Sequence, residues 1–582
     1  MNIENTIKDQ INQVIEKEYC LKDFKFQIEE PKDKIYGDYT TNAAMLLAKK
    51  RKSDPIKIGN EIIDKLNKAK KKKSVQLSEY FSKIRVVKPG FINFYLADDF
   101  LKNELAHILD NGDEYGRTNE GNGRTIVVDY SAPNIAKKMH VGHLRSTIIG
   151  SSICRVYSFL GYRVIGDNHL GDWGTQFGKI IFMYKRKYGE VIKDDMTVGE
   201  MESMYVDFHK KEKIDLGFAG KARAELKKLQ NKDKFNYRLW QLFCKISISE
   251  FKKIYKVLDV DFDLWRGESF YNDMLQEVVE AALNGRIAKR SEGAVVIPLK
   301  KYGLPDFLIQ KSDEAFLYST TDLATIKYRH EKYNPIKNIY VVASQQELYF
   351  KQLFKTSELL GLSSNEEMIH VKFGLILGAN GRKMSTREGE VADLWDIINE
   401  GISKAKKLMT KKNPDLTGDG LESAAAIVAI GAIKYNDLSQ NRLTDVKFDW
   451  DKMLALESGS APYLQYTYVR IKSIFSRIGF EFDSLQKNID LSLLGRSNEM
   501  ILIRDLVRFP GIVKRVLSEH RLNLITIYLE ELAKDFHNFY ENSSVLRSEK
   551  NLAVARLGLL KAVARIMKNG LFLLGIDTPD RM

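Results

Sequence analysis

Hydrophobic residues follow two different spacings near the middle of the chain, and together they predict a β-α-β unit. The run 125–130 (Thr-Ile-Val-Val-Asp-Tyr) is mostly apolar, as in a buried strand of a parallel sheet. Apolar residues then recur at helical spacing: Leu144, Ile148, Ile149, Ile153, Val156 and Leu160. Gly161 ends this helix, and 162–166 (Tyr-Arg-Val-Ile-Gly) predict the next strand. Parallel sheets bind ligands at the carboxyl ends of their strands, beside helix N-termini, so we expect a ligand where this helix begins.

The front of the chain mixes helical and strand patterns and predicts an α+β domain. Four apolar residues lie at helical spacing: Ile7, Ile11, Val14 and Ile15. Residues 91–95 (Phe-Ile-Asn-Phe-Tyr) favour a short strand, and the Gly, Asn and Asp cluster at 111–123 indicates a linker. The lysine run 70–73 predicts an exposed loop, for which solvation is a better explanation than an RNA contact.

After the linker, the pattern predicts a Rossmann-like parallel-sheet core that is interrupted by a charged, helical insertion. Strand patterns resume at 316–318, 339–342 and 369–374. Beyond about Asp393 strand signals almost vanish, and a helical tail follows. The predicted fold is therefore multidomain α/β plus all-α. The predicted boundaries are 1–115 for the α+β domain, 120–395 for the core with its insertion at about 184–297, 396–450 for a helical connecting region, and 451–582 for a helical bundle.

Composition narrows the class of protein. A chain of 582 residues predicts three or more domains, and its net charge of +14 favours a polyanionic partner, although a lysine-rich solvated surface explains the charge equally well. The three cysteines are too few for a disulfide framework or a four-ligand zinc site, which favours a reducing compartment. The longest apolar run, 424–433, is too short for a membrane span, and the first residues do not resemble a signal peptide. We expect a cytoplasmic protein.

The helix start carries a His-Val-Gly-His motif that suits ATP. Gly142 has no Cβ, so a flat base could lie against the backbone there, and His140 and His143 can both donate to phosphate oxygens. Two histidines on a helix often form only a polar face, so the motif is weak by itself. A second motif, Lys383-Met384-Ser385, lies between glycines and polar residues that predict a mobile loop. Such a loop could close a cation over departing pyrophosphate, and the pair of motifs strongly predicts a nucleotide site.

The two motifs resemble the signature sequences of class I aminoacyl-tRNA synthetases. The sequences around them resemble those of arginyl-tRNA synthetases in particular: Ser-Ala-Pro-Asn-Ile-Ala-Lys at 131–137, Leu-Gly-Asp-Trp-Gly-Thr-Gln-Phe-Gly at 170–178 and Ala-Ser-Gln-Gln at 343–346. The front (37–44) and the segment from Tyr463 to Arg470 resemble that family's tRNA-contacting and anticodon-binding domains. The resemblance extends over nearly the whole chain, and it implies ATP-dependent attachment of L-arginine to its tRNA through an arginyl-adenylate.

The resemblance also implies roles for individual residues. Tyr318, Asp322 and Gln346 would form the arginine side-chain pocket, and Asp129 and Asn134 would bind the α-ammonium group. The implied tRNA-binding residues are Asn93, Tyr463, Tyr466, Arg470 and Met582. A guanidinium does call for carboxylates around its planar edge and an aromatic face beside it. Without the family, however, Asp322 is more simply a helix cap and Tyr318 a core aromatic, and core packing explains Tyr463 nearly as well.

One position departs from the family pattern. Thr386 stands where the second motif usually has another lysine, and Lys137, just before the first motif, is thought to supply a substitute charge in arginyl enzymes. The sequence leaves the division of labour among Lys137, Lys383 and Arg387 open. We expect ATP with Mg²⁺ as substrate, no tightly bound metal, no membrane and a monomer. Two rival functions are a small-molecule nucleotidylyltransferase and a catalytically inactive tRNA-binding paralogue.

Overall fold

The computed structural model describes residues 3–31, 33–70, 77–215, 217–378, 381, 392–482, 489–545 and 547–582. The chain divides into two compact units. The first comprises Met1–Arg117, Thr467–Arg515 and Ile527–Gly570, and the second comprises Thr118–Tyr466, Val516–Thr526 and Leu571–Met582. The predicted Lys383-Met384-Ser385 loop, with Thr386 and Arg387, lies outside the described residues, as do Lys71, Lys72 and Lys73.

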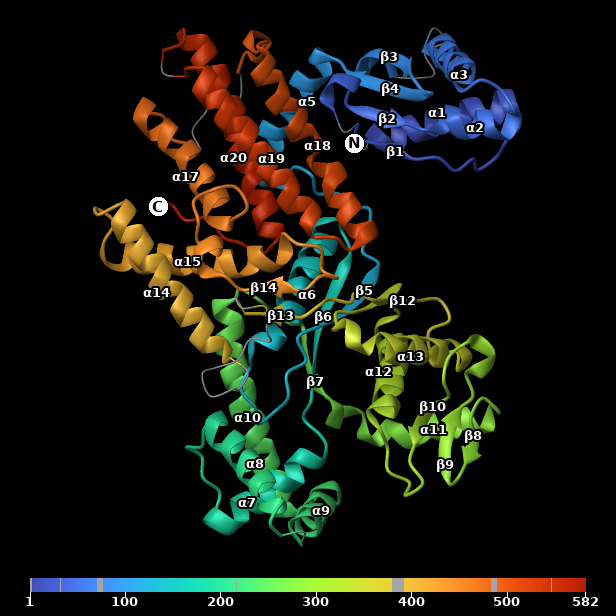
Figure 1. The fold of residues 1–582 in the computed structure, drawn as a ribbon, viewed down its shortest axis with the longest axis vertical. Helices are drawn as coiled ribbons and strands as arrows, with labels where there is room; N and C mark the ends of the chain where they lie inside the picture. The colour runs from blue at the N-terminus through green and yellow to red at the C-terminus, as the bar shows by residue number, and fades with distance from the viewer. Residues whose placement is uncertain are drawn as a thin grey trace. The chain divides into compact units, whose positions relative to one another are not determined.

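The first unit begins with the predicted α+β part (Figure 1). An antiparallel sheet of order β1-β2-β4-β3 packs beside helices. The predicted helix of Ile7, Ile11, Val14 and Ile15 is confirmed, because all four are buried on one face of α1. The elements are α1 (Ile3–Tyr19), β1 (Ile28–Glu29), β2 (Tyr39–Thr41), α2 (Ala43–Arg51), α3 (Pro55–Lys70), α4 (Leu77–Tyr80), β3 (Phe81–Val87), β4 (Phe91–Leu96) and α5 (Asp98–Asn111).

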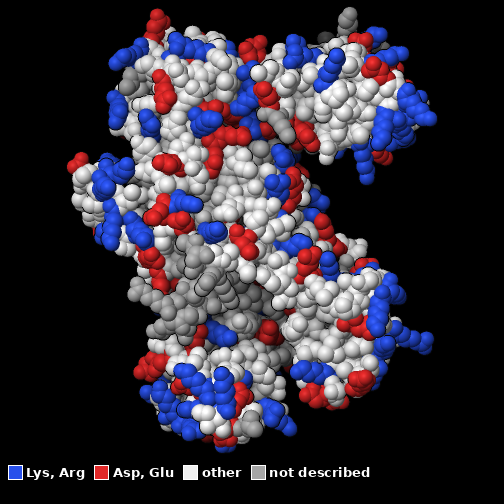
Figure 2. All heavy atoms as spheres, viewed as in Figure 1, with Lys and Arg blue, Asp and Glu red and all other residues white. Residues whose placement is uncertain are grey.

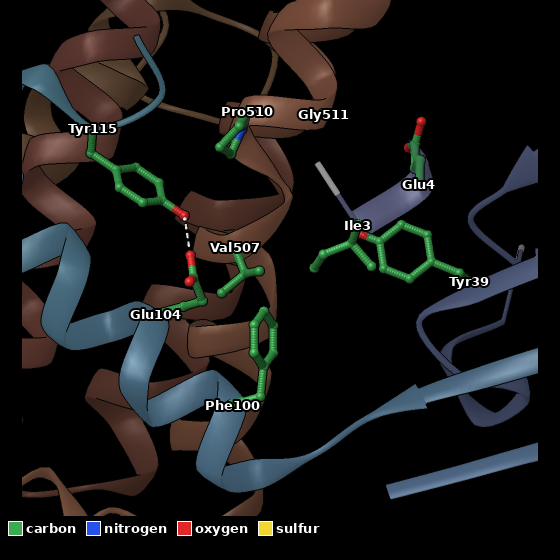
Figure 3. A pocket seen from close by; sticks show the side chains of 9 residues that line it. All are labelled: Ile3, Glu4, Tyr39, Phe100, Glu104, Tyr115, Val507, Pro510 and Gly511. Atoms are coloured by element: carbon green, nitrogen blue, oxygen red, sulfur yellow. Dashed lines mark hydrogen bonds between the residues drawn. The ribbon is translucent and has the colours of Figure 1, made fainter. Parts of the chain in front are cut away.

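Long amphipathic helices complete this unit. They are formed by most of each of α17 (Ala461–Ile478), α18 (Ser497–Glu519), α19 (Asn523–Asn542) and α20 (Lys550–Leu573). A small hollow of about 350 Å³ lies within the unit, with Glu4, Glu104 and Tyr115 among its lining residues (Figure 3). The Tyr115 hydroxyl donates to Glu104 over 3.4 Å, and burial together with Glu30 raises the pKa of Glu4. The predicted helical tail is thus confirmed.

The second unit is built on a five-stranded parallel sheet of order β12-β11-β5-β6-β7. Its strands are β5 (Thr125–Asp129), β6 (Arg163–Leu170), β7 (Leu264–Gly267), β11 (Lys337–Tyr340) and β12 (Glu367–His370). The first two enclose α6 (Val141–Phe159), which confirms the predicted β-α-β unit (Figure 1). Because β5 has β6 on one side and β11 on the other, the strand order reverses at its carboxyl end, where open sheets bind their ligands.

The charged stretch between the halves of the core contains helices, as predicted, but also strands. Its helices are α7 (Thr175–Tyr188), α8 (Val198–Glu212), α9 (Gly217–Gln230), α10 (Lys234–Val257) and α11 (Leu275–Asn284). Between α10 and α11 lies β7, the edge strand of the parallel sheet. A small antiparallel sheet follows, of β8 (Lys289–Ser291), β9 (Ala294–Ile297) and β10 (Phe307–Gln310). Exposed lysines gather on the α7–α9 helices, at the bottom of Figure 2.

Three predicted strands need correction, and one of them, predicted at 369–374, lies earlier, at 367–370. Residues 316–318 form no strand, because Phe316 makes only an isolated bridge with Gln310 and Tyr318 already begins α12 (Tyr318–Tyr333). The Leu317 amide donates to the Thr320 hydroxyl at this helix start, so local capping overrides the aromatic strand pattern. The strand predicted at 339–342 lies earlier, at 337–340.

The remaining elements of the second unit are mainly helical. They are α13 (Glu347–Leu359), β13 (Ile376–Leu377), α14 (Leu394–Lys412), α15 (Gly418–Leu438), β14 (Val446–Lys447) and α16 (Trp450–Met453). Strands β13 and β14 pair in parallel. Across the described ranges, no helix combines the length and the apolar character that a membrane crossing requires.

Candidate functional site

The first motif forms the amino-terminal cap of α6. The His140 ring accepts a hydrogen bond at Nδ1 from the Gly142 amide (3.0 Å), and the His143 ring accepts one at Nδ1 from the His140 amide (3.1 Å). These reciprocal bonds place the two rings 4.0 Å apart, centroid to centroid. A Cβ at Gly142 would come within 2.7–2.8 Å of the His140 ring, which explains the glycine between the two histidines.

The capping bonds also fix the protonation of both rings. A neutral imidazole that accepts at Nδ1 carries its proton on Nε2, so each histidine offers an Nε2–H donor. Burial, and then the neighbouring His140 and Lys137, lower the pKa of His143 to about 3. His143 is therefore neutral at physiological pH, and it can donate to a phosphate oxygen without first acquiring a proton.

The segment that follows the second motif is anchored beside the first. The Val141 amide donates to the Ala392 carbonyl over 3.1 Å, and the Leu394 amide donates to the Met139 carbonyl over 3.0 Å. Lys138 pairs with Asp393 at 3.1 Å. Residues 392–394, which follow the segment of Lys383 in the chain, thus lie at the start of α6.

Lys137 lies in the same region but is engaged elsewhere. Its ammonium sits 4.7 Å from the centre of the Tyr205 ring on α8, a cation–π contact. This geometry keeps the charge close enough to His143 to affect its pKa. The structure therefore brings Lys137, His140, Gly142 and His143 together at one helix start.

The predicted α-ammonium residues differ in their surroundings. Asp129, at the carboxyl end of β5, accepts a hydrogen bond from Arg329 over 2.6 Å, and Arg329 also binds Asp167 at 2.8 Å. Asp129 is thus held in place by a buried arginine of α12. Asn134 is exposed and lies opposite Gly171, with which it forms an isolated bridge.

Tyr318 and Asp322, two of the residues predicted to bind the arginine side chain, lie in the first turns of α12. Asp322 accepts a hydrogen bond from the Tyr349 hydroxyl, and Tyr349 also contacts the Tyr318 ring at 5.0 Å. The helix-cap explanation of Asp322 is wrong, because Leu317 caps α12 and Asp322 is its fifth residue. The core explanation of Tyr318 is also wrong, because this residue is 62% exposed. Gln346 is exposed too, and it stands immediately before α13.

Three polar residues that were not among the predicted site residues interact electrostatically with Asp322 or with one another: Glu268, Asp172 and His169. Glu268 directly follows β7, and burial raises its pKa to about 7, with the carboxylates of Asp322 and Asp172 adding to the shift and His169 opposing it. Burial also raises the pKa of Asp322, again against His169. Desolvated carboxylates therefore converge at the ends of β5, β6 and β7. The signal for Glu268 in the sequence is weak because β7 lies in a stretch predicted to be helical.

The predicted tRNA-binding residues lie on other elements. Tyr463, Tyr466 and Arg470 are all on α17, as their spacing predicts, and Tyr466 is 39% exposed. Arg470 lies over the Tyr540 ring at 4.4 Å. Asn93 is only 2% exposed and accepts a hydrogen bond from Thr40, which leaves little of it open to a partner. The Met582 carbonyl accepts from Asn413 over 3.1 Å.

Family models match three parts of the chain. The model of the catalytic domain of class I (R) tRNA synthetases matches residues 104–450, which is more than half of the chain. The arginyl-tRNA synthetase N-terminal domain model matches 2–96, and the DALR anticodon-binding domain model matches 464–582. The chain belongs to the class I arginyl-tRNA synthetase family. Both motifs of this arginyl-tRNA synthetase and its carboxylate pocket fall within the catalytic match.

Individual relatives agree with this membership. The arginine–tRNA ligase of Clostridium perfringens is 39% identical over 584 residues, which cover 100% of both chains. That of Fusobacterium nucleatum is 39% identical over 548 residues and 94% of each chain. The arginyl-tRNA synthetase structure from Plasmodium falciparum has a TM-score of 0.85 at 28% identity, covering 100% of this chain and 99% of its own. The Thermus thermophilus arginyl-tRNA synthetase shares the fold at 22% identity, with a TM-score of 0.82 and full coverage of both chains.

Proposed function

We propose that this enzyme attaches L-arginine to its tRNA in two steps, through an arginyl-adenylate. The relatives named arginine–tRNA ligase support this activity over the full length of the chain. The observation that carries the choice of amino acid is the group of desolvated carboxylates beside Tyr318. Burial raises their pKa values, with neighbouring carboxylates adding to the shift, and a bound guanidinium would stabilise their ionised forms.

In the first step, the arginine carboxylate attacks the α-phosphorus of ATP, and pyrophosphate leaves. The Nε2–H groups of His140 and His143 stabilise the charge that builds on the phosphate oxygens. Lys137 and Lys383 supply positive charge to the departing pyrophosphate, and Mg²⁺ enters with the nucleotide. Orientation and electrostatics carry this step, so no protein nucleophile is needed.

In the second step, the 2′-hydroxyl of the terminal tRNA adenosine attacks the activated carbonyl, and AMP leaves. The remaining ATP contacts that we assign are Gly142, Met384 and Ser385. Arginine would be held by Asp129 and Asn134 at its α-ammonium group, and by Tyr318, Asp322, Gln346 and Glu268 at its guanidinium. For tRNA we retain Asn93, Tyr463, Tyr466, Arg470 and Met582. We expect a monomer in the cytoplasm, and its three free thiols suit a reducing compartment.

The activity is tested by ATP–pyrophosphate exchange and by aminoacylation of total tRNA, with each amino acid in turn. We expect arginine alone to be used. His143→Ala should lower adenylation by about 10²-fold or more while tRNA affinity is retained, because one donor to the transition state is lost. His107→Ala, at an exposed histidine of α5, is the matched control. An unchanged rate in His143→Ala would remove this residue from the mechanism.

The arginine pocket has its own test. Asp322→Asn keeps the size of the side chain but removes its charge, so the KM for arginine should rise by about tenfold or more and the KM for ATP should change little. Asp451→Asn, at an exposed residue of α16, controls for the loss of one negative charge. Equal, small effects on both substrates would contradict the pocket.

A further inference from the structure

A hollow with basic side chains in its lining lies in the unit that contains the parallel sheet, and the nucleotide motifs are not part of it. It measures about 240 Å³ including its mouth, and it opens between the end of α15, the loop that follows α15, and residues 520–523. Its lining includes Arg442, Arg521, His520, Gln440 and Asn523. These side chains are mostly hydrogen-bond donors, and two of them carry permanent positive charge.

The two guanidinium groups share a single carboxylate partner among the described residues, Glu519, which pairs with Arg521. Within the described ranges, Arg442 has no ion pair, and the Nε atoms of both Arg442 and Arg521 are buried without a hydrogen-bond partner. Both arginines line the same hollow, and burial together with the charge of Arg521 lowers the pKa of Arg442. Arg521 binds Glu519 through Nη1 (3.1 Å), and Asp437 in the lining is already paired with Arg145.

The loop that carries Arg442 is held rigidly. Arg145 of α6 donates to the carbonyl oxygens of Arg442 (3.2 Å) and Thr444 (2.9 Å), and its Nε binds Asp437 at 3.0 Å. The Gly374 amide also donates to the Arg442 carbonyl over 2.9 Å. Because the backbone that carries Arg442 is fixed, binding an anion there costs little additional ordering of this loop.

His520 lines the hollow as a neutral side chain and adds no positive charge to it. It hydrogen-bonds to the Tyr157 hydroxyl at 2.9 Å, and burial, helped by Arg442 and Lys337, lowers its pKa to about 4. Lys337 itself is paired with Glu367. The histidine is therefore neutral at physiological pH, and the positive potential of the hollow comes from the two arginines.

We propose that this hollow binds one phosphate group of the tRNA backbone between Arg442 and Arg521. The hollow is small even with its mouth included, so the proposed contact is with a phosphate group at the mouth and not with an enclosed nucleoside. Guanidinium forks match the oxygens of a phosphate, and arginine contacts to phosphates fix the register of a nucleic acid on a protein. The choice of tRNA as the source rests on the proposed function, whereas the anion site rests on the hollow itself.

The test measures the equilibrium binding of tRNA to the full-length protein as a function of KCl concentration. The slope of log K against log [salt] is negative, and loss of one phosphate contact reduces its magnitude by about 0.7–0.9. We expect this decrease in both Arg442→Gln and Arg521→Gln. Arg290→Gln, an equal charge change at an exposed arginine of β8, should leave the slope near that of the wild type. Thermal unfolding and circular dichroism establish that each variant is folded, and Arg521→Gln is the second probe if Arg442→Gln fails to fold.

A parallel titration with inorganic phosphate separates the two sources of the anion. If free phosphate raises the melting temperature of the wild type but not of Arg442→Gln, while the tRNA salt slope is unchanged, the tRNA assignment is overturned. An unchanged slope with no response to phosphate overturns the site altogether. ATP–pyrophosphate exchange and aminoacylation at saturating tRNA should persist in both variants, so failure of this inference is distinguishable from failure of the proposed function.

Discussion

The affinity of the enzyme for arginine should depend on pH through Glu268. The pKa of this carboxyl is raised to about 7 by burial and by Asp322 and Asp172, so near neutrality it is only half ionised in the empty pocket. The cationic arginine side chain binds the ionised carboxylate, so the apparent affinity for arginine decreases as the protonated fraction of Glu268 increases. With a pKa near 7, the ionised fraction rises from about 0.1 at pH 6 to about 0.9 at pH 8. The KM for arginine should therefore fall about tenfold over this range.

The assay is steady-state aminoacylation at saturating ATP and tRNA, with arginine varied at intervals between pH 6 and 8. Glu268→Gln should raise the KM for arginine and flatten its pH dependence, because the amide does not titrate. Glu292→Gln, at an exposed glutamate, should follow the wild type. A wild-type KM for arginine that is constant or rises with pH would refute the reasoning, as would a KM for ATP that shows the same tenfold change.

The ionisation of Glu268 favours arginine binding but lowers the stability of the folded protein. Folded Glu268 keeps its proton up to about pH 7, whereas its ordinary pKa is 4.5, so the folded state binds more protons between these values. The contribution of Glu268 to stability is therefore fully present below pH 4.5 and is lost as the pH rises through 7. Glu268→Gln should raise the melting temperature of the arginine-free enzyme at pH 8 more than at pH 5.

Three further substitutions test other parts of the molecule. Gly142→Ala should lower the adenylation rate by about 10²-fold, because the added Cβ would displace the His140 ring. Alanine has a higher helix propensity than glycine, so we expect the variant to remain folded, and circular dichroism checks this. Tyr466→Ala should weaken tRNA binding by about 1–3 kcal/mol if its ring stacks on a base, and an unaltered KM for tRNA would argue against the contact. Arg145→Met should cost about 3–5 kcal/mol in urea unfolding by leaving Asp437 buried and unpaired, and partial recovery in Arg145→Met/Asp437→Leu would confirm the cause.

The sequence by itself determined the elements whose signals are local. The apolar run at 125–129 and the helical spacing after His140 depend on neighbouring residues alone, so the β-α-β unit and the nucleotide motif at its helix start were predictable. The helical tail was predictable for the same reason. The resemblance to arginyl-tRNA synthetases supplied the pocket residues, which spacing alone left open between a cap, a core residue and a ligand.

Only the tertiary structure decided which distant side chains share an environment. Glu268 joins Asp322 because β7, a short strand within a mainly helical stretch, pairs with β6 and brings its carboxyl end to the pocket. Asp129 is fixed by Arg329, 200 residues away in the chain. Burial, pKa values and ion pairs depend on everything that packs around a group, and this information is absent from any local window of sequence. For that reason the sequence predicted which residues should bind a ligand, and the fold determined the electrostatic surroundings of those residues.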